Sequence, residues 1–484
     1  MIRVGPGPTR TSVDATDVAA HRAIAPESYP MLFRLAIPAI FVSAWAAQVH
    51  AQPNIVLILA DDMSWVGTSV LMDPARPDSK SDYHNTPALE RLASEGMRFT
   101  DAYAPHPNCS PTRLAIQTGK TPTQLGMTDI INRNSGPFYE GLPMVPPQHI
   151  NHIPHAEVTI AELIKRHRPG YATAHFGKWH LGGGGPGQHG YDEHSGTTSN
   201  REGESPAPDP KRTVSVTTRA VDFLRHRSSV GEPFFLQVSY YAVHLGIFAF
   251  DETIAEFEAK PKGQRHNHAG HAAMTHELDA GVGRILDALH RLELADNTYV
   301  IFTSDNGSYH EAGQTRVSSN APLRGQKAST WEGGIRVPLL VRGPGIAAGS
   351  VSRVPVTGTD LFPTIADMLQ VQAELSPLIE GASLHGLLSN EGDGSLARRF
   401  DSLVWHFPHY QVQKGTTPMS SIRAGNWKLV RLYETGKTFL YDLSADIGET
   451  EDLSAEKPAL ARELAAQLDD YLAAVDAPMA RHSK

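Results

Sequence analysis

Apolar residues occur along this chain in short runs of strand length, and polar residues follow each run. The first run, Asn54 to Ala60 (NIVLILA), is continuously apolar, as strands buried on both faces of a parallel sheet are. Similar runs predict strands at Tyr171 to Phe176, Phe234 to Tyr240 and Thr298 to Thr303. These four strands are expected to form the framework of the protein.

Helical patterns separate these strands. In the stretch His271 to Leu292, apolar residues recur at the spacing of one buried helix face. Thr159 and Glu162 fit the capping box of a helix that begins at Ile160. Strands that alternate with helices favour an α/β fold, with a large, mainly parallel sheet sandwiched by helices. Further helices are expected at Pro87 to Glu95, Ile160 to His167 and Thr217 to His226.

The pattern changes after Ser389 to Leu396, a stretch rich in Gly, Ser and Asp. Thr435-Gly436 fits a hairpin turn between two of the strands beyond it, and a helix is expected at Pro458 to Val475. We therefore predict a catalytic domain at 52–395 and a smaller α+β domain at 396–484, with a small antiparallel sheet and a helix. Its strands are expected at Ser402 to Phe407, Met419 to Arg423, Trp427 to Tyr433 and Lys437 to Tyr441.

The N-terminal region resembles a secretory signal. A short basic start at Met31 to Arg34 precedes an apolar run, and Val49-His50-Ala51 fits a cleavage site. The apolar run is too short for a transmembrane anchor and contains Pro38. We predict a signal peptide at 31–51, an upstream extension or mis-assigned start at 1–30, and a secreted or periplasmic product without a stable membrane anchor.

Composition narrows the choice of partners. The 484 residues are 40% hydrophobic and 20% charged, which is ordinary for a globular protein. The formal net charge of −9 argues against a general nucleic-acid binder, so any positive field for an anionic substrate must be local.

Cys109 is the single cysteine of the chain and therefore cannot form an intramolecular disulfide. A helix-like run, Leu114 to Thr118, begins just after it and ends at Gly119. Free N–H groups at a helix start, together with Arg113, would hold an anion formed at position 109. A free cysteine is also often a small buried hydrophobe, and these residues alone leave both interpretations open.

Oxygen ligands follow two of the predicted strands. Asp61 and Asp62 end the first strand, and Asp305 and Asn306 follow the strand at Thr298 to Thr303. Each acid alone fits a helix cap or a turn. Together, at the carboxyl ends of parallel strands, they favour a hard cation, and irregular multi-carboxylate coordination favours Ca²⁺ over Mg²⁺.

Cys109-x-Pro111-x-Arg113 followed by Thr118-Gly119-Lys120 resembles the signature of the type I, formylglycine-dependent sulfatases, which are arylsulfatase-like members of the alkaline phosphatase superfamily. The resemblance extends from Pro53 to about Ala477 and implies an alkaline phosphatase-like fold. The other matching motifs are Leu59-Ala60-Asp61-Asp62, Gly177 to Gly182, His244, Ser304 to Gly307, Leu323 to Lys327 and Glu332 to Pro338.

In that family a formylglycine-generating or sulfatase-maturating enzyme oxidises the cysteine to formylglycine, and one hydroxyl of the hydrated aldehyde attacks sulfur. The resemblance implies that Cys109 is this residue. It also implies that Arg113, Lys178 and His180 hold the hydrate, whereas His244 and Lys327 contact the sulfate and leaving group. The implied Ca²⁺ ligands are Asp61, Asp62, Asp305 and Asn306, together with position 109.

The chemistry of a sulfate ester accounts for these groups. Its negative charge repels a nucleophile, so a cation and basic side chains such as Lys178 and Lys327 must neutralise its oxygens. The departing alcohol needs a proton, and a histidine with a near-neutral pKa is suited to supply it. His244 is the candidate, while His106, His406 and His409 could line the pocket.

The chain departs from the family pattern in two places. The histidine motif, often Ala-Pro-His-x-Pro, reads Ala242-Val243-His244-Leu245-Gly246 here, and Ala328 follows Lys327 where Gly is common. Neither departure removes a functional side chain.

The sequence therefore predicts a secreted sulfatase that acts on sulfated carbohydrates or aryl sulfates. A phosphonate monoester or phosphodiester hydrolase of the same superfamily is an alternative, because sulfuryl and phosphoryl groups are similar in shape. A catalytically silent glycan-binding relative is a third hypothesis, which predicts broken catalytic positions, and none is broken here.

Overall fold

The computed structural model describes residues 52–133, 140–312 and 315–483. The signal peptide predicted at 31–51 and the extension predicted at 1–30 lie outside them. No helix in this part of the chain is long and apolar enough to span a bilayer.

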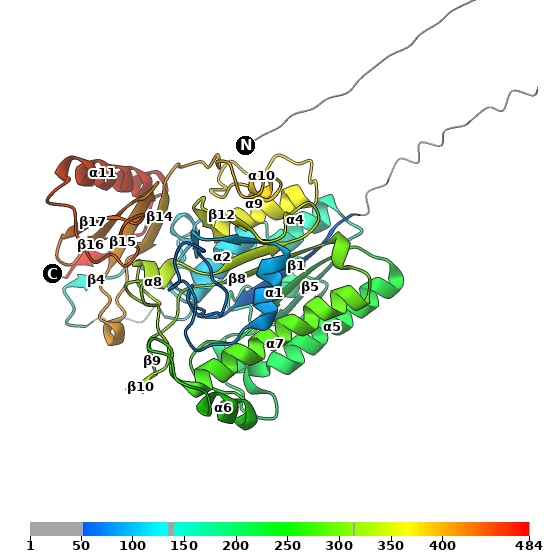
Figure 1. The fold of residues 1–484 in the computed structure, drawn as a ribbon. Helices are drawn as coiled ribbons and strands as arrows, with labels where there is room; N and C mark the ends of the chain where they lie inside the picture. Colours follow the sequence, from blue (N-terminus) through cyan, green and yellow to red (C-terminus); the bar gives the residue numbers. More distant parts are fainter. Residues whose placement is uncertain (1–51, 134–139, 313–314, 484) are drawn as a thin grey trace, which may run out of the picture. The chain divides into compact units, whose positions relative to one another are not determined.

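An eight-stranded sheet is the centre of the described structure (Figure 1). Its strands lie in the order β12 (Ser350–Ser352), β2 (Met97–Phe99), β11 (Leu339–Arg342), β8 (Thr298–Ser304), β1 (Asn54–Ala60), β7 (Phe234–Ser239), β5 (Ala172–Gly177) and β6 (Glu193–His194). β1 pairs in parallel with β7 and β8. Only β11 runs antiparallel, to both β8 and β2, so the prediction of a mainly parallel sheet is confirmed.

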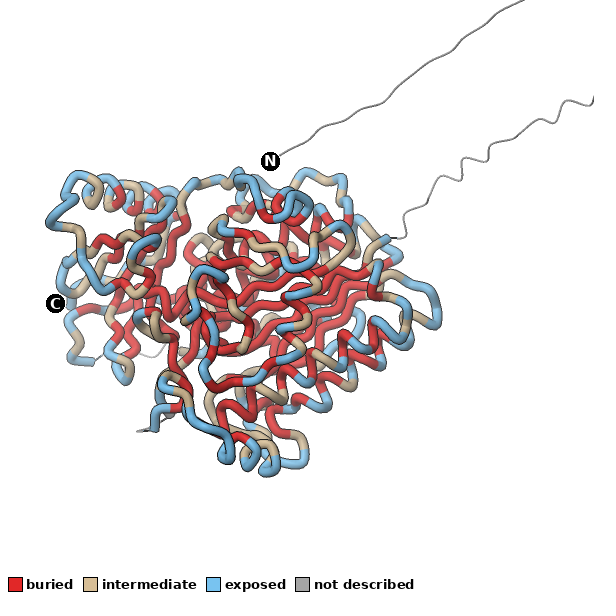
Figure 2. Tube along the Cα trace, in the orientation of Figure 1, coloured by how far each residue is buried: buried red, intermediate tan, exposed pale blue. Residues whose placement is uncertain are grey.

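The side chains of β1 alternate between two cores, as expected for a pleated strand. Val56 and Ile58 pack into one hydrophobic cluster with helices α1 (Pro87–Glu95), α5 (Thr213–Val230) and α7 (Ala269–Arg291). Ile55, Leu57 and Leu59 pack into the other with helices α2 (Cys109–Thr118), α4 (Ile160–His167) and α9 (Leu361–Met368). Because both faces are covered, the central strands are buried along their length (Figure 2).

Local signals placed several elements correctly. Thr159 and Glu162 form the predicted capping box, and α4 covers the predicted residues. α2 begins at Cys109 itself, earlier than the apolar run suggested, and ends at Gly119 in the left-handed conformation, with φ 69°. Shorter helices are α3 (Pro122–Leu125), α6 (Asp251–Glu258), α8 (Glu332–Ile335) and α10 (His385–Leu388).

A separate antiparallel sheet forms near the C-terminus, as predicted. It consists of β14 (Leu403–Phe407), β15 (Met419–Ala424), β16 (Trp427–Leu432) and β17 (Thr438–Asp442), and α11 (Pro458–Ala474) packs on it through Leu464 and Leu468. The other face packs against Ala328 and Trp331. The domain boundary at 395/396 stays a prediction. Two-stranded pairs complete the described elements: β3 (Ala102–Tyr103) with β13 (Val356–Thr357), β4 (Met144–Val145) with β18 (Arg481–His482), and β9 (Glu311–Ala312) with β10 (Thr315–Arg316).

Candidate active site

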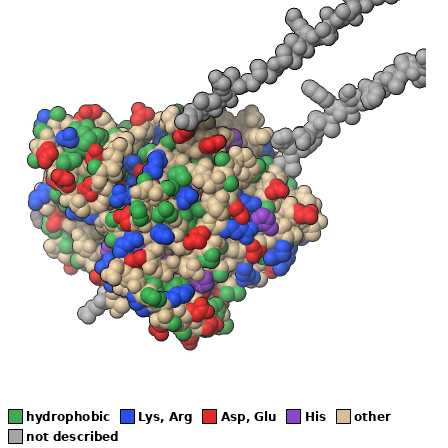
Figure 3. Space-filling model, in the orientation of Figure 1, with side chains coloured by type: hydrophobic (Ala, Val, Ile, Leu, Met, Phe, Trp, Pro, Cys, Tyr) green, Lys and Arg blue, Asp and Glu red, His purple; other side chains and the backbone are tan. Residues whose placement is uncertain are grey.

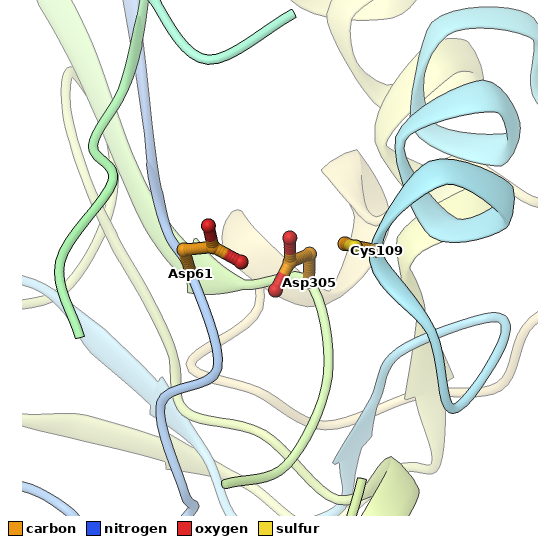
Figure 4. Close-up of side chains that lie close together, drawn as sticks. All are labelled: Asp61, Cys109 and Asp305. Carbon is orange, nitrogen blue, oxygen red and sulfur yellow. The ribbon is translucent and has the colours of Figure 1, made fainter. Parts of the chain in front are cut away.

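The polar residues that follow the central strands meet at the carboxyl edge of the large sheet. Asp61 and Asp62 follow β1, Asp305 follows β8, and Lys178 follows β5. Figure 4 shows Asp305 between Asp61 and Cys109, with the three side chains supplied by three separate segments. The structure thus brings together residues that are up to 244 positions apart, as the resemblance implied.

Cys109 is fully buried at the first residue of α2. Its Sγ lies 3.4 Å from Nδ1 of His180 and 3.9 Å from Nζ of Lys327. Burial raises the pKa of the thiol, although Lys178 and Lys327 act against this. The thiol is therefore held in its neutral form among groups suited to an anion.

Three oxygens at this site find no hydrogen-bond partner among the described residues: Asp61 Oδ1, Asp62 Oδ2 and Asn306 Oδ1. All three residues are buried, where an unpaired oxygen is costly. Ligand atoms of Asp61, Cys109 and Asp305 also lie within 4.8 Å of one another. Carboxylate and amide oxygens without histidine nitrogen suit a hard cation, so these residues fit Ca²⁺.

Basic side chains surround the acids. Lys178 Nζ lies 2.5 Å from Asp61, and Lys327 Nζ lies 2.5 Å from Asp62. Burial alone would raise the pKa of both carboxyls, but these lysines, together with His244, lower it below the usual aspartate range. Both carboxylates are therefore ionised at neutral pH.

The ion-paired charges at the centre are equal in number. Arg113, Lys178 and Lys327 offset Asp61, Asp62 and Asp305 (three bases against three acids). A divalent cation held by the acids would leave the centre with net positive charge, which would attract an anionic substrate.

His180 and His244 lie at the same centre. Burial, reinforced by Lys178, lowers the pKa of His180 well below its usual value. Burial also lowers the pKa of His244 to about 4, although Asp62 opposes the shift. Nδ1 of His244 is 3.0 Å from the Leu245 carbonyl oxygen, and Nε2 lies 3.8 Å from Asp62 Oδ2. His244 is thus neutral at neutral pH here, and its role as proton donor stays a prediction.

Lys211 joins the site although no sequence signal indicated it. The side chain is buried, and its Nζ donates to the Leu245 carbonyl oxygen at 3.1 Å, the same oxygen that His244 contacts. It forms no ion pair with any residue that the structure describes. Burial lowers the pKa of Lys211 to about 8. Lys211 follows a Pro-rich stretch, where neither periodicity nor a motif marked it.

The backbone is constrained at the site. Asp62, His180, Lys211 and Ala328 all have positive φ, between 54° and 67°, which is unusual for residues other than glycine. Glycine adopts this conformation without strain, so Ala328 stands where a glycine would also fit. Gly177 has φ 99°, and an added Cβ would lie 1.9 Å from the Ser239 carbonyl oxygen.

The three other candidate histidines differ in their surroundings. Both ring nitrogens of His406 have partners, since Nδ1 contacts Ser420 Oγ and Nε2 contacts the Pro478 carbonyl oxygen, and its place in the pocket stays a prediction. His409 Nε2 contacts Thr128 Oγ1 at 2.8 Å. His106 is buried, with Nε2 unpaired among the described residues.

Comparison with known proteins gives consistent matches. A family model described as Sulfatase matches residues 53–371, and one described as N-sulphoglucosamine sulphohydrolase, C-terminal, matches residues 326–477. A protein named sulfatase from Formosa agariphila is 30% identical, in an alignment that covers 89% of this chain and 89% of that one. Human N-acetylgalactosamine-6-sulfatase is 31% identical over 366 residues, which cover 69% of this chain and 65% of that one.

Solved structures match over most of the chain. The crystal structure of Ps i-CgsB in complex with k-i-k-neocarrahexaose has a TM-score of 0.71 at 26% identity, covering 87% of this chain and 93% of that one. A second structure, of a protein in complex with its substrate D-glucosamine-2-N,6-O-disulfate, has a TM-score of 0.68 at 20% identity. The match covers 88% of this chain and 98% of that one. At that identity the second match establishes likeness of fold.

Proposed function

Because this chain belongs to the sulfatase family, and so is a hydrolase of sulfate esters, we propose that it removes sulfate from carbohydrates with a formylglycine at position 109 and a Ca²⁺ ion. The observation that carries this proposal is the placement of Cys109 within reach of His180 and Lys327, beside three buried oxygens that have no hydrogen-bond partner in the described part of the chain.

The proposed ligands of the ion are Asp61, Asp62, Asp305, Asn306 and position 109. When present, the formylglycine hydrate supplies the nucleophilic oxygen, and Ca²⁺ draws charge from the sulfate oxygens. A formylglycine-generating or sulfatase-maturating enzyme of the host is the partner that this proposal requires.

The chain's own residues bind and orient the ester. Arg113 and Lys178 are fixed by their contacts with Asp305 and Asp61, so they present positive charge without reorganisation. Lys327 and His244 are proposed to contact the sulfate and the departing oxygen. His244 is held through Nδ1 by the Leu245 carbonyl oxygen, which leaves Nε2 to face the site.

Carbohydrate esters are preferred as substrates because several related proteins act on sugars by name: N-acetylgalactosamine-6-sulfatase is one of them. The match to a sulfatase family model favours sulfate over phosphonate esters. Secretion is proposed from the signal peptide predicted at 31–51.

Mass spectrometry of the peptide that contains Cys109, from protein made in its own host, tests the nucleophile. Conversion of the thiol to an aldehyde lowers the peptide mass by about 18 Da. Turnover of 4-nitrophenyl sulfate compared with 4-nitrophenyl phenylphosphonate tests the ester class. Active, metal-loaded protein with an unmodified cysteine would refute the formylglycine nucleophile, and faster phosphonate turnover would refute the sulfate preference.

A further inference from the structure

A continuous path of contacts leads from Cys109 into the C-terminal part of the chain. Lys327 Nζ, 3.9 Å from Cys109 Sγ, lies 5.0 Å from the ring centre of Tyr309. The Tyr309 hydroxyl accepts a hydrogen bond from Gln411 Nε2 at 3.3 Å. Gln411 lies in the connection between β14 and β15, so this connection joins the contacts that lead to the nucleophile.

The path returns to Cys109 through a different segment. Gln411 Oε1 accepts from Arg133, whose Nε lies 4.0 Å from Asp129 Oδ2. Asp129 Oδ1 accepts from Asn108 Nδ2 at 2.9 Å, and Asn108 immediately precedes Cys109. The contacts therefore close into a ring beside position 109.

The ring carries cations at its outer side. The Arg133 side chain is 30% exposed, and its contact with Asp129 is at the limit of an ion pair. Lys414 is half-buried, with Nζ 4.5 Å from the Tyr309 ring centre and 3.3 Å from the Glu311 carbonyl oxygen. No carboxylate of the described residues pairs with Lys414. We name Asp129, Arg133, Tyr309, Gln411 and Lys414 the rim cluster.

The rim cluster also offers an unused acceptor. Asp129 is fully buried, and its Oδ2 has no hydrogen-bond partner among the described residues. An ionised or neutral carboxyl in this position can accept a hydrogen bond from a sugar hydroxyl. An aromatic ring, an acceptor and two cations are together the groups that recognise an acidic sugar.

Resting on the proposed function, we infer that the rim cluster binds the sugar that carries the scissile sulfate, and that Arg133 and Lys414 select sugars with a second anionic group. The second group is a further sulfate or a carboxylate, since both accept charge-assisted hydrogen bonds. A net charge of −9 makes such local cations necessary for a dianionic substrate. Acidic and basic side chains are interspersed on the face that Figure 3 shows.

The test measures kcat/KM on three sugars with the full, matured chain: N-acetylgalactosamine 6-sulfate, N-acetylgalactosamine 4,6-disulfate and a chondroitin disaccharide 6-sulfate that carries a carboxylate. Wild type is expected to prefer at least one dianionic sugar over the monosulfate. The ratio of kcat/KM for the dianionic sugar to kcat/KM for the monosulfate is expected to fall about 10-fold in Arg133→Gln and in Lys414→Gln. This fall corresponds to the loss of one charge-assisted hydrogen bond. The matched control, Arg225→Gln, removes an exposed cation that pairs with Asp222 on α5 and retains the preference.

Binding provides an independent readout. Calorimetric titration measures the affinity of Cys109→Ala protein, which cannot cleave the ester, for the preferred dianionic sugar. This affinity is expected to fall about 10-fold when Arg133→Gln is added. An unchanged preference in both rim variants overturns the inference, and so does wild-type enzyme that cleaves 4-nitrophenyl sulfate but none of the sugars. Wild type that cleaves no sulfate ester at all refutes the proposed function itself.

Discussion

Arg113 binds Asp305 through two nitrogens, because Nε and Nη2 donate to the same Oδ2 at 2.9 and 2.7 Å. Nη1 of Arg113 also donates to the Lys178 carbonyl oxygen at 2.7 Å. One buried guanidinium thus joins helix α2, which carries Cys109, to the ends of strands β5 and β8. Asp305 consequently has two roles, as a proposed metal ligand and as the counter-ion of Arg113.

Asp305→Ala is therefore expected to weaken Ca²⁺ binding and to destabilise the fold. An Arg113 left buried without its carboxylate costs about 3–5 kcal/mol. Calcium titration calorimetry and urea unfolding measure the two effects. Asn306→Ala is the matched variant, because it removes a proposed ligand without removing the carboxylate partner of a buried cation, and it should weaken Ca²⁺ binding with less loss of stability. Full activity of Asp305→Ala after chelator treatment would show that the metal site is misassigned.

Cys109→Ala is expected to leave a folded protein that no longer turns over 4-nitrophenyl sulfate. The stability change should be about 1 kcal/mol, since only one small side chain is removed. Activity should fall by about 10³-fold or more, because the proposed nucleophile is lost. Thermal unfolding and initial rates measure the two quantities, and retained turnover contradicts the mechanism.

Lys211→Met is expected to raise the stability of the protein and to lower its activity. Lys211 is a buried cation that pairs with no carboxylate of residues 52–133, 140–312 and 315–483, so replacing it with an apolar side chain of similar length should stabilise the protein by about 1 kcal/mol. Loss of a positive charge beside the sulfate should lower kcat/KM by about 10–100-fold. The exposed Lys437→Met serves as the control and should change neither quantity. Wild-type kinetics of the Lys211→Met enzyme would show that Lys211 does not contribute to the activity.

Stability should fall in mild acid because of a cluster of three histidines, none of which is a candidate site residue. His84 lies with its ring centre 4.6 Å from that of His266 and 5.3 Å from that of His271. Both ring nitrogens of His271 are buried without a partner among the described residues. Burial lowers the pKa of His271 to about 3, from an ordinary value of 6.5.

The sign follows from proton binding. Between pH 6.5 and about 3 the unfolded chain binds a proton at His271 that the folded protein does not, so stability is lost as the pH falls below 6.5. At pH 5 this amounts to about 2 kcal/mol. His271→Leu should lose less stability than wild type between pH 7.5 and pH 5 in urea unfolding. An equal loss of stability in wild type and in His271→Leu would mean that groups other than His271 cause the acid sensitivity.

Strand ends were the part of the site that the sequence could predict. NIVLILA is apolar enough to be recognised as a buried strand, and its end places Asp61 and Asp62 at the carboxyl edge. The same reasoning places Asp305 after β8, so their meeting follows from parallel pairing. The short strands β2, β11 and β12 were missed, because three or four residues carry little periodicity.

Contacts between segments that are distant in the sequence could not be predicted from it. Arg133 and Gln411 are separated by 278 positions, and no local pattern relates them. Lys211 reaches the site through a left-handed backbone conformation that neither its neighbours nor its own side chain indicates. The pKa of His244 likewise depends on burial and on Asp62, which come together only in the folded chain.

The complete burial of Cys109 limits when the residue can be modified. Segments that are synthesised after it contact this residue and its helix, among them Lys327 and helix α9, which shares a hydrophobic cluster with α2. An enzyme that needs access to the thiol must therefore act before these later segments have folded onto it. Modification of position 109 would then compete kinetically with folding, so that a slower-folding variant is modified more completely than a faster-folding one.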